Sequence, residues 1–325
     1  MRLFALQGTH ILGQAVAQAM KMELDPIEER EFPDWEHKSR PLISVRNEDV
    51  YVLHNLNGGG AHSPADKLVR LLFFIATCRQ NGAARVTAVT PYLAFMRKDQ
   101  QTKPRDPVNT RYVAQMFESV GADMVVTLEV HNPAAFQNAF RCSTTHLDLR
   151  HLFAARIGEL SAGNRVILAS PDSGGMRRTR ALQEAFAAAT GRQAELAIME
   201  KHRSEGVVSG ELFAGDVPGA DVFIVDDMIS SGGTMLRAAK ACRERGARHV
   251  YALATHGLFS EGSKELFARP EFDKVIVSDS VAPFTLGADD FCSKLEVVSC
   301  ASLIGDAIHR LHTGGSINRL LNPKS

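Results

Sequence analysis

Short apolar runs alternate with amphipathic stretches along this 325-residue chain. In the first half, "DVYVLHN", "RVTAVTPY" and "MVVTLEVH" read as strands, and "PADKLVRLLFFIATCRQNGA" and "RYVAQMFESVGA" read as helices. The second half repeats this order with "NRVILASPD", "TRALQEAFAAATG", "VFIVDDM", "TMLRAAKACRERGA" and "RHVYALATH". The alternation predicts an α/β protein built from βαβ units, with helices on both faces of parallel sheets.

The two halves also match each other in detail. "DVYVLHNLNGGG" aligns with "DVFIVDDMISSGG", which indicates a tandem duplication. We therefore predict two doubly wound domains, over residues 1–148 and 149–325, and expect the last ~25 residues to pack against the N-terminal domain. His54 and Asn55 stand where Asp226 and Asp227 stand, so only the second copy keeps paired acids.

Composition narrows the choice of partners and compartment. Lys plus Arg and Asp plus Glu both number 37, so no overall field draws the chain to nucleic acid or an anionic membrane. The five cysteines show no CxxC spacing, which argues against a disulfide framework and a zinc site. No apolar stretch approaches the ~18 residues of a membrane span, and the N-terminus lacks the pattern of a secretion signal. We expect a soluble cytoplasmic protein.

The run "VFIVDDMISSGGTM", residues 222–235, concentrates candidate chemistry. We expect Asp226 to Thr234 to form a strand-to-helix loop, at the sheet edge where ligands of parallel sheets bind. Its glycines and hydroxyls, beside free N–H groups at a helix start, suit a phosphate monoester. Adjacent carboxylates suit vicinal hydroxyls, or a cation held by hydroxyls. Together they predict a sugar-phosphate site formed by Asp226, Asp227, Ser230, Ser231, Gly232, Gly233 and Thr234. The alternative is a pair of solvated acids beside an ordinary glycine loop.

This loop resembles the phosphoribosyl-diphosphate-binding motif of the type I phosphoribosyltransferase fold. Five further motifs occur with it: "FPDWE" at 32–36, "PYLAFMRKD" at 91–99, "TLEVHN" at 127–132, "SPDSGG" at 170–175 and "EKHR" at 200–203. From about Leu3 to Leu321 the chain resembles the ribose-phosphate diphosphokinase family. The resemblance implies transfer of the diphosphoryl group of ATP to O1 of ribose 5-phosphate, with Mg²⁺, in a homo-oligomer that is a dimer or a hexamer.

The resemblance also implies roles for individual residues. Phe32, Asp34 and Glu36 are expected to contact the adenine of ATP bound in a neighbouring subunit. Arg97, Lys98 and Asp99 are expected to contact the triphosphate, and His131 and Asp172 to lie near the magnesium nucleotide. Lys201 and Arg203 are expected to contact the transferring diphosphate. By themselves, these residues also fit solvated acidic or basic surface clusters and a surface histidine. The polar, glycine-containing stretch after "EKHR" shows little regular pattern, and we expect a mobile lid there.

The chain departs from the family at several positions, among them His202, Gln100 and Gln101. Ser230 replaces an aspartate, Gly232 an alanine, Trp35 a glycine and Lys98 a glutamine. These changes leave open a different sugar-phosphate substrate and a catalytically weak regulatory paralogue. A nucleobase phosphoribosyltransferase would share the loop, but it would not need "FPDWE", "FMRKD" and "EKHR" across a duplicated chain.

Overall fold

The structure, a computed structural model, describes residues 1–325 apart from 60, 205–206, 261, 283–292 and 323–325. The side chains of residues 200–212 and 264 also lie outside the description. The chain divides into two compact units. The first unit comprises Met1–Asp148 and Ser299–Ser325, and the second comprises Leu149–Val298. Of the helices described, none has both the length and the apolar character needed to cross a bilayer.

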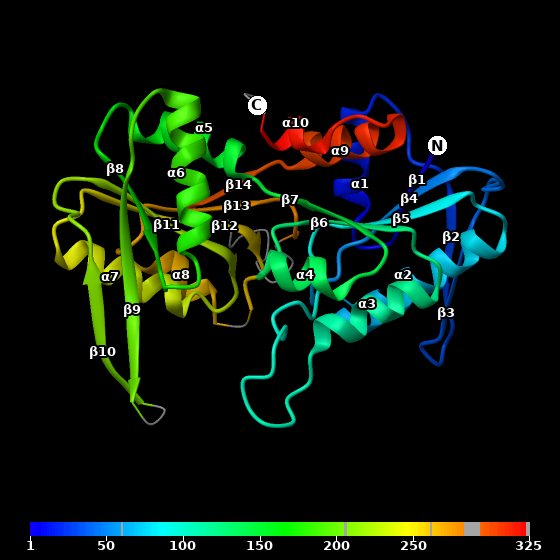
Figure 1. Ribbon diagram of the computed structural model, residues 1–325, viewed down its shortest axis with the longest axis horizontal. Coiled ribbons are helices and arrows are strands. Elements are labelled where there is room, and N and C mark those ends of the chain that lie inside the picture. Colours follow the sequence, from blue (N-terminus) through cyan, green and yellow to red (C-terminus); the bar gives the residue numbers. More distant parts are fainter. Residues whose placement is uncertain (60, 205–206, 261, 283–292, 323–325) are drawn as a thin grey trace. The chain divides into compact units, whose positions relative to one another are not determined.

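The first unit contains a five-stranded parallel sheet of order β1-β4-β5-β6-β7 (Figure 1). Its strands are β1 (Arg2–Ala5), β4 (Asp49–Leu53), β5 (Arg85–Thr90), β6 (Met124–Leu128) and β7 (Ser143–Leu147). One face is covered by α2 (Pro64–Gln80), α3 (Asn109–Ser119) and α4 (Pro133–Ala139), and the other by α1 (His10–Ala19) and α9 (Ala301–Thr313), which α10 (Ile317–Leu321) follows.

Local sequence explains where α2 begins and which face it buries. Ser63 caps the helix, because its hydroxyl accepts the Asp66 N–H while the Asp66 carboxylate accepts the Ser63 N–H, and Pro64 occupies the first helical position. Leu71 and Phe74 are fully buried and pack with the apolar side chains of β4 and β5. This arrangement confirms the α/β reading of the first half.

The C-terminal helix α9 packs against α1, at the other end of the chain. Gly305 allows the close approach, since a Cβ at this position would lie 3.0 Å from Met20 Cγ and 3.4 Å from the Val16 carbonyl oxygen. The end of α9 is tied to the sheet, because His312 Nδ1 lies 2.7 Å from Asp49 Oδ2 and Arg85 donates to the Leu311 carbonyl.

The second unit is built on a seven-stranded sheet of order β10-β9-β8-β11-β12-β13-β14 (Figure 1). The strands are β8 (Val166–Ser170), β9 (Glu195–Ser204), β10 (Val207–Ala214), β11 (Asp221–Ile229), β12 (His249–Gly257), β13 (Lys274–Ser278) and β14 (Leu295–Val298). Helices α5 (Arg150–Ser161) and α6 (Met176–Thr190) cover one face, and α7 (Gly233–Glu244) and α8 (Lys264–Ala268) cover the other.

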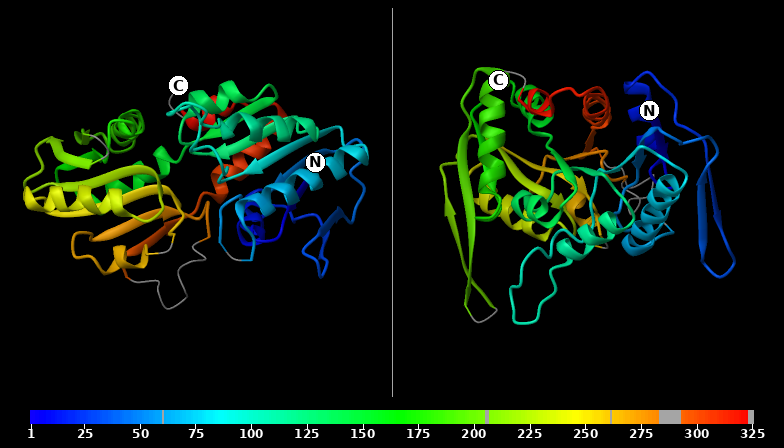
Figure 2. Two further views of the ribbon diagram at one scale, coloured as in Figure 1. Left: turned by 90° about the horizontal axis from the view of Figure 1, so that it is seen from below. Right: turned by 45° about the vertical axis from the view of Figure 1, so that its right-hand side comes forward.

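Two antiparallel hairpins depart from the parallel pattern. The stretch after "EKHR" was expected to show little regular structure, and this was wrong, because β10 pairs antiparallel with β9 at the edge of the sheet. Its segment "VVSGELFA" contains enough β-branched and aromatic residues to form an edge strand. In the first unit, β2 (Ile27–Glu31) and β3 (His37–Pro41) form a hairpin that extends away from the sheet of that unit (Figure 2).

The contact between α1 and α9 yields a stability prediction. Gly305→Val adds a branched side chain where a single Cβ already lies within 3.5 Å of α1 atoms. We expect a loss of about 1–3 kcal/mol from overpacking, measured as a lower midpoint of thermal unfolding. Ser302→Val, at an exposed position of the same helix, is the control. Equal midpoints for the two variants would contradict the prediction.

Candidate active site

Asp226 and Asp227 lie within β11, not in the loop where we expected them. β11 continues to pair with β12 through Met228↔His256 and Ile229↔Gly257, so the strand ends only at Ile229. The helix α7 then begins at Gly233, which leaves residues 230–232 as the connection. The longer strand fixes both carboxylates on a rigid element at the carboxyl end of the sheet, where they can bind a ligand in a defined orientation.

One arginine of α6 contacts both carboxylates. Arg178 Nη1 lies 3.3 Å from Asp226 Oδ1, and Nη2 lies 3.4 Å from Asp227 Oδ1. The side chains of Arg178, Asp226 and Asp227 are 18%, 21% and 4% exposed, so the three charges are largely withdrawn from water. Asp226 Oδ1 also accepts the Asp227 N–H at 2.8 Å. The guanidinium thus offsets the repulsion between two adjacent buried acids.

The acid pair has unusual protonation chemistry. Burial raises the pKa of Asp226 to about 7, and the hydrogen bond and negative charge of Asp227 act in the same direction. The positive charge of Arg178 opposes this rise. The pair therefore gains or loses a proton near neutral pH. The ionised form is the one whose oxygens all accept hydrogen bonds, as sugar hydroxyls require.

The loop after β11 makes a tight turn into α7. Gly232 has φ +78°, and a Cβ there would lie 2.8 Å from Leu266 Cδ1, so both the backbone conformation and the neighbour require glycine. Ser230 Oγ donates to Ser260 Oγ at 3.3 Å, which braces the loop against the segment after β12. Thr234 Oγ1 accepts a bond of 3.2 Å from Arg237 Nη2. Hydroxyls and helix N–H groups therefore surround this turn.

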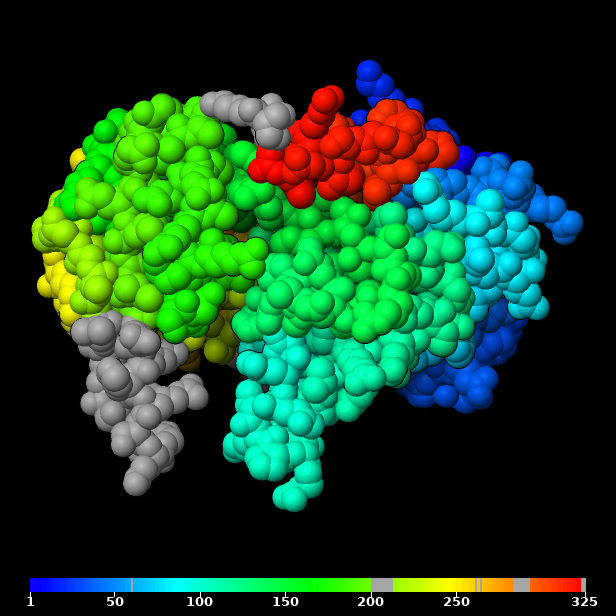
Figure 3. All heavy atoms as spheres, in the orientation of Figure 1, coloured from blue at the N-terminus to red at the C-terminus, as the bar shows by residue number. Residues whose placement is uncertain are grey.

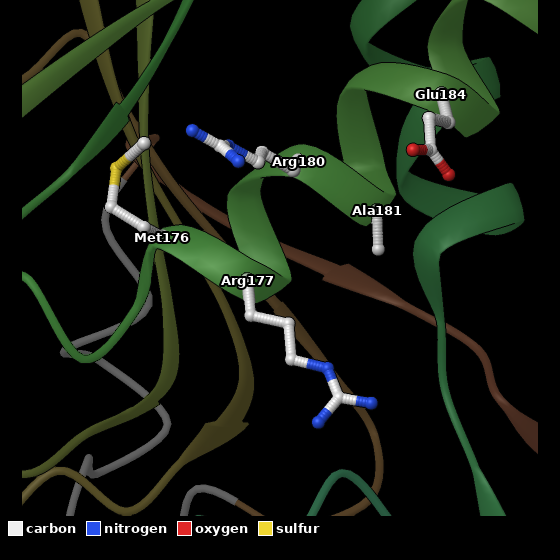
Figure 4. Close-up of a pocket in the computed structure, with 5 residues that line it drawn as sticks. All are labelled: Met176, Arg177, Arg180, Ala181 and Glu184. Carbon is white, nitrogen blue, oxygen red and sulfur yellow. The ribbon is translucent and has the colours of Figure 1, made fainter.

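Asp172 lies in the turn between β8 and α6. Its side chain is exposed, its Oδ1 accepts the Gly175 N–H at 3.0 Å, and its carbonyl accepts from Ser170 Oγ. The same helix then carries Arg178, so one element connects the Asp172 turn to the acid pair. The exposed face of α6 borders a surface hollow (Figure 4) lined by Met176, Arg177, Arg180, Ala181 and Glu184.

Lys201 and Arg203 fall on β9, and their side chains lie outside what the structure describes. Their backbone position is nevertheless informative. Lys201 pairs with Glu211 and Arg203 with Val208 across the hairpin, so the "EKHR" motif lies on β9, the strand next to the edge strand β10, and not in a basic turn.

In the first unit, Arg97, Lys98 and Asp99 lie within the long connection between β5 and α3, whose tip projects from the surface (Figure 3, cyan). Arg97 is exposed. Lys98 forms an ion pair with Asp106, whose carboxylate also accepts from the backbone of the same connection. The lysine at position 98, where the family has glutamine, therefore has a partner within the same connection. The ion pair joins the two sides of the projecting segment.

Asp99 connects this segment to the end of β6. Its Oδ2 accepts from Asn132 Nδ2 at 2.7 Å, and Asn132 Oδ1 caps α4 by accepting the Ala135 N–H. His131, the preceding residue, is exposed. The structure thus brings together the "FMRKD" and "EVHN" motifs, which are more than 30 residues apart in the sequence.

Phe32, Asp34 and Glu36 form the tip of the β2–β3 hairpin. The Phe32 N–H donates to the Glu36 carbonyl, and the Arg30 guanidinium carbon lies 5.0 Å from the centre of the Phe32 ring. Trp35 has φ +72° and is 79% exposed, which explains why glycine suits this position. In the described part of the chain, no hydrogen bond or ion pair joins this tip to the Arg97–Asp99 segment.

The first unit has converted the equivalent of the acid pair into structural residues. His54 is buried, and burial lowers its pKa to about 3, so the ring is neutral. Its Nδ1 lies 3.3 Å from Thr9 Oγ1, which in turn accepts the Asn55 N–H, and Asn55 Oδ1 accepts the Tyr92 N–H. These bonds connect the loops after β1, β4 and β5.

Comparisons with known proteins follow this geometry. Residues 1–121 match a model of the N-terminal domain of ribose phosphate pyrophosphokinase, and residues 199–322 match a phosphoribosyl synthetase-associated domain. The ribose-phosphate pyrophosphokinase of Chlorobaculum tepidum is 33% identical over 97% of this chain and 93% of its own length. That of Brucella melitensis is 33% identical over 99% of this chain and all of its own. This chain belongs to the ribose-phosphate pyrophosphokinase family.

A solved structure supports the same assignment to the ribose-phosphate pyrophosphokinase family. Phosphoribosylpyrophosphate synthetase from Mycobacterium smegmatis has a TM-score of 0.86 and 30% identity, over 97% of this chain and 99% of its own. The α/β fold predicted from the sequence is therefore confirmed, and the chain is an enzyme of the ribose-phosphate pyrophosphokinase class.

A magnesium site in this pyrophosphokinase would rely on few protein ligands. The described residues contain no group of three or more His, Cys, Asp or Glu side chains able to hold a metal. Mg²⁺ in phosphoryl-transfer sites usually keeps several waters and binds one or two carboxylates plus substrate phosphates. The exposed Asp172 carboxylate fits such a site, whereas the His131 imidazole is a poorer donor for Mg²⁺.

Sequence reasoning missed two residues of the site in this family member. Arg178 and Arg237 each follow a recognised motif by a few positions, within helices α6 and α7. The available signal was their spacing, since side chains three or four residues into a helix reach back over its first turn. Which arginine of "MRRTR" does so depends on the rotation of α6 on the sheet, which the sequence alone does not specify.

The acid pair of the pyrophosphokinase yields a pH prediction. The pKa of Asp226 is raised to about 7 in the folded state, so ionisation at higher pH opposes folding. Asp226→Asn should therefore raise Tm by several degrees at pH 8 and change it little at pH 4, since each kcal/mol shifts Tm by about 2–4 °C in a unit of this size. Glu184→Gln, an exposed carboxylate on α6, is the control. A Tm difference that does not grow with pH would contradict this.

Proposed function

We propose that this chain transfers the β,γ-diphosphoryl group of ATP to O1 of ribose 5-phosphate, giving phosphoribosyl diphosphate and AMP. The observation that carries the proposal is the acid pair of β11, held by Arg178 beside the hydroxyl-lined turn into α7. Acids for sugar hydroxyls and a helix start for phosphate occur together on one rigid strand and turn.

On the sugar side, Asp226 and Asp227 accept hydrogen bonds from the ribose hydroxyls. Ser230, Ser231 and Thr234 supply hydroxyls to the 5-phosphate, while the backbone at Gly232 and Gly233 approaches it closely. Holding the sugar at both ends orients its anomeric hydroxyl for attack on the β-phosphorus. Positioning of this kind supplies a large part of the acceleration in phosphoryl transfer, and no covalent nucleophile is needed.

On the phosphate side, Arg97, Lys201 and Arg203 neutralise charge that develops on the transferring diphosphate, with Lys98 and Asp99 completing the ATP segment. Asp172 and His131 would lie near Mg²⁺, which would supply positive charge to the phosphate oxygens of ATP. Phe32, Asp34 and Glu36 contact the adenine, through stacking and hydrogen bonds, in a neighbouring subunit. This last role requires a homo-oligomer, a dimer or a hexamer.

Phosphorus NMR tests the reaction directly. The purified protein with ATP, Mg²⁺ and ribose 5-phosphate should produce AMP and a new anomeric diphosphate in equal amounts. Ribose without the 5-phosphate is the matched control substrate. A folded protein that binds ATP but yields neither product would overturn the proposal and favour a different sugar phosphate or a regulatory role, for which Ser230 in place of an aspartate is the relevant change.

Lys201 gives a second test. Lys201→Ala should lower kcat by about 10²-fold or more, because it removes a charge that stabilises the transition state, with Tm little changed. Lys240→Ala, at an exposed position of α7, removes the same charge elsewhere and should leave kcat unaltered. Near-wild-type kcat for Lys201→Ala would exclude the catalytic role.

A further inference from the structure

Arg237 lies one turn into α7 and points back toward the loop that precedes the helix. Its Nη2 donates to Thr234 Oγ1 at 3.2 Å. A Cβ built on Gly233 would lie 3.8 Å from Arg237 Nη1 and 3.9 Å from Ser231 Oγ. The guanidinium and the loop hydroxyls therefore border the same first residue of the helix, as expected for a helical side chain that leans toward the N-terminus.

The charge of Arg237 has no counterion in the described part of the chain. The side chain is half-buried, its Nε is shielded from solvent without a hydrogen-bond partner, and no carboxylate oxygen of a described residue lies within 4 Å of its guanidinium. Arg243, on the same helix, instead pairs with Asp273 at 2.6 Å. Because partial burial of an unpaired cation is unfavourable, an anion bound at this turn would be stabilised by Arg237 and would stabilise it in return.

We propose that Arg237 binds the phosphate group of the sugar substrate and makes the enzyme selective for phosphorylated sugars. The loop from Ser230 to Thr234 contains hydroxyls and glycines but no cation, and the acids of β11 repel a phosphate dianion. A guanidinium offers two parallel N–H groups to two phosphate oxygens. Arg237 also occupies an acceptor site of Thr234 Oγ1, which leaves the hydroxyl proton of Thr234 to be donated to the phosphate.

This inference rests on the proposed function and adds to it a source of specificity. The free N–H groups of a helix start bind any anion weakly. A partly desolvated guanidinium on the same turn binds a phosphate dianion more strongly than a neutral hydroxymethyl group. The preference for ribose 5-phosphate over ribose therefore comes from the phosphate group.

The test compares one substitution with two ligands. KM for ribose 5-phosphate and the competitive inhibition constant of ribose are measured for wild type, Arg237→Met, Arg237→Lys and the control Lys240→Met, which removes a charge from an exposed position of α7. Arg237→Met should raise KM for ribose 5-phosphate about 10- to 100-fold, with kcat at saturation within a few-fold of wild type. Its inhibition constant for ribose should match that of wild type, and Arg237→Lys should recover part of the loss.

Two results would overturn the inference. The first is an unchanged KM for ribose 5-phosphate in Arg237→Met. The second is an equal loss of affinity for ribose 5-phosphate and for ribose, because that result would show that Arg237 only holds Thr234 in place. If Arg237→Met does not fold, Arg237→Lys is measured in its place, with a smaller loss expected for ribose 5-phosphate only. Absence of turnover in wild type would count against the proposed reaction, and titration of ribose 5-phosphate into the folded variants would then decide the role of Arg237 by binding.

Discussion

The second unit depends on the neutralisation of two adjacent carboxylates by a single guanidinium. Asp226 and Asp227 are consecutive in β11, so their charges repel at short range, and burial strengthens that repulsion. Arg178 reaches both of them from α6. The ion pairs fix the rotation of α6 on the sheet, and with it the turn that carries Asp172. Two adjacent acids in a strand thereby constrain how a helix packs on the sheet.

Much of the fold was accessible from the sequence because it is local. Alternating strand and helix patterns specified the α/β class, and the stretch predicted as a helix from Pro64 is α2. One error arose where the pairing partner is distant, because pairing with β12 extends β11 through the two acids. The other concerned residues 207–214, which pair with the adjacent strand β9 in a hairpin that the polar, glycine-containing sequence did not indicate. Within the site, the motif residues were recognisable by type, whereas Arg178 was not, since its partners lie 48 and 49 positions away in the chain.

The duplicated halves show how one scaffold diverges physically. Where the second unit has two acids, the first has the neutral His54 and the amide Asn55. These two residues form hydrogen bonds with Thr9 and Tyr92, which connect three loops. A cluster of charged groups lies instead in the connection after β5, where Lys98 pairs with Asp106 and Asp99 accepts a hydrogen bond from Asn132. The departure from the family at Lys98 therefore has a compensating partner in Asp106.

The packing of α9 on α1 has a consequence for how the protein is made. The first unit contains both the opening and the closing segments of the chain, so a ribosome must synthesise the whole second unit before α1 acquires its neighbour. Until then the nascent chain leaves uncovered the face of α1 that α9 later contacts near Val16. The second unit has no such dependence and can complete its sheet first. Termination between residues 298 and 301 would therefore leave an incomplete, aggregation-prone first unit attached to a complete second unit.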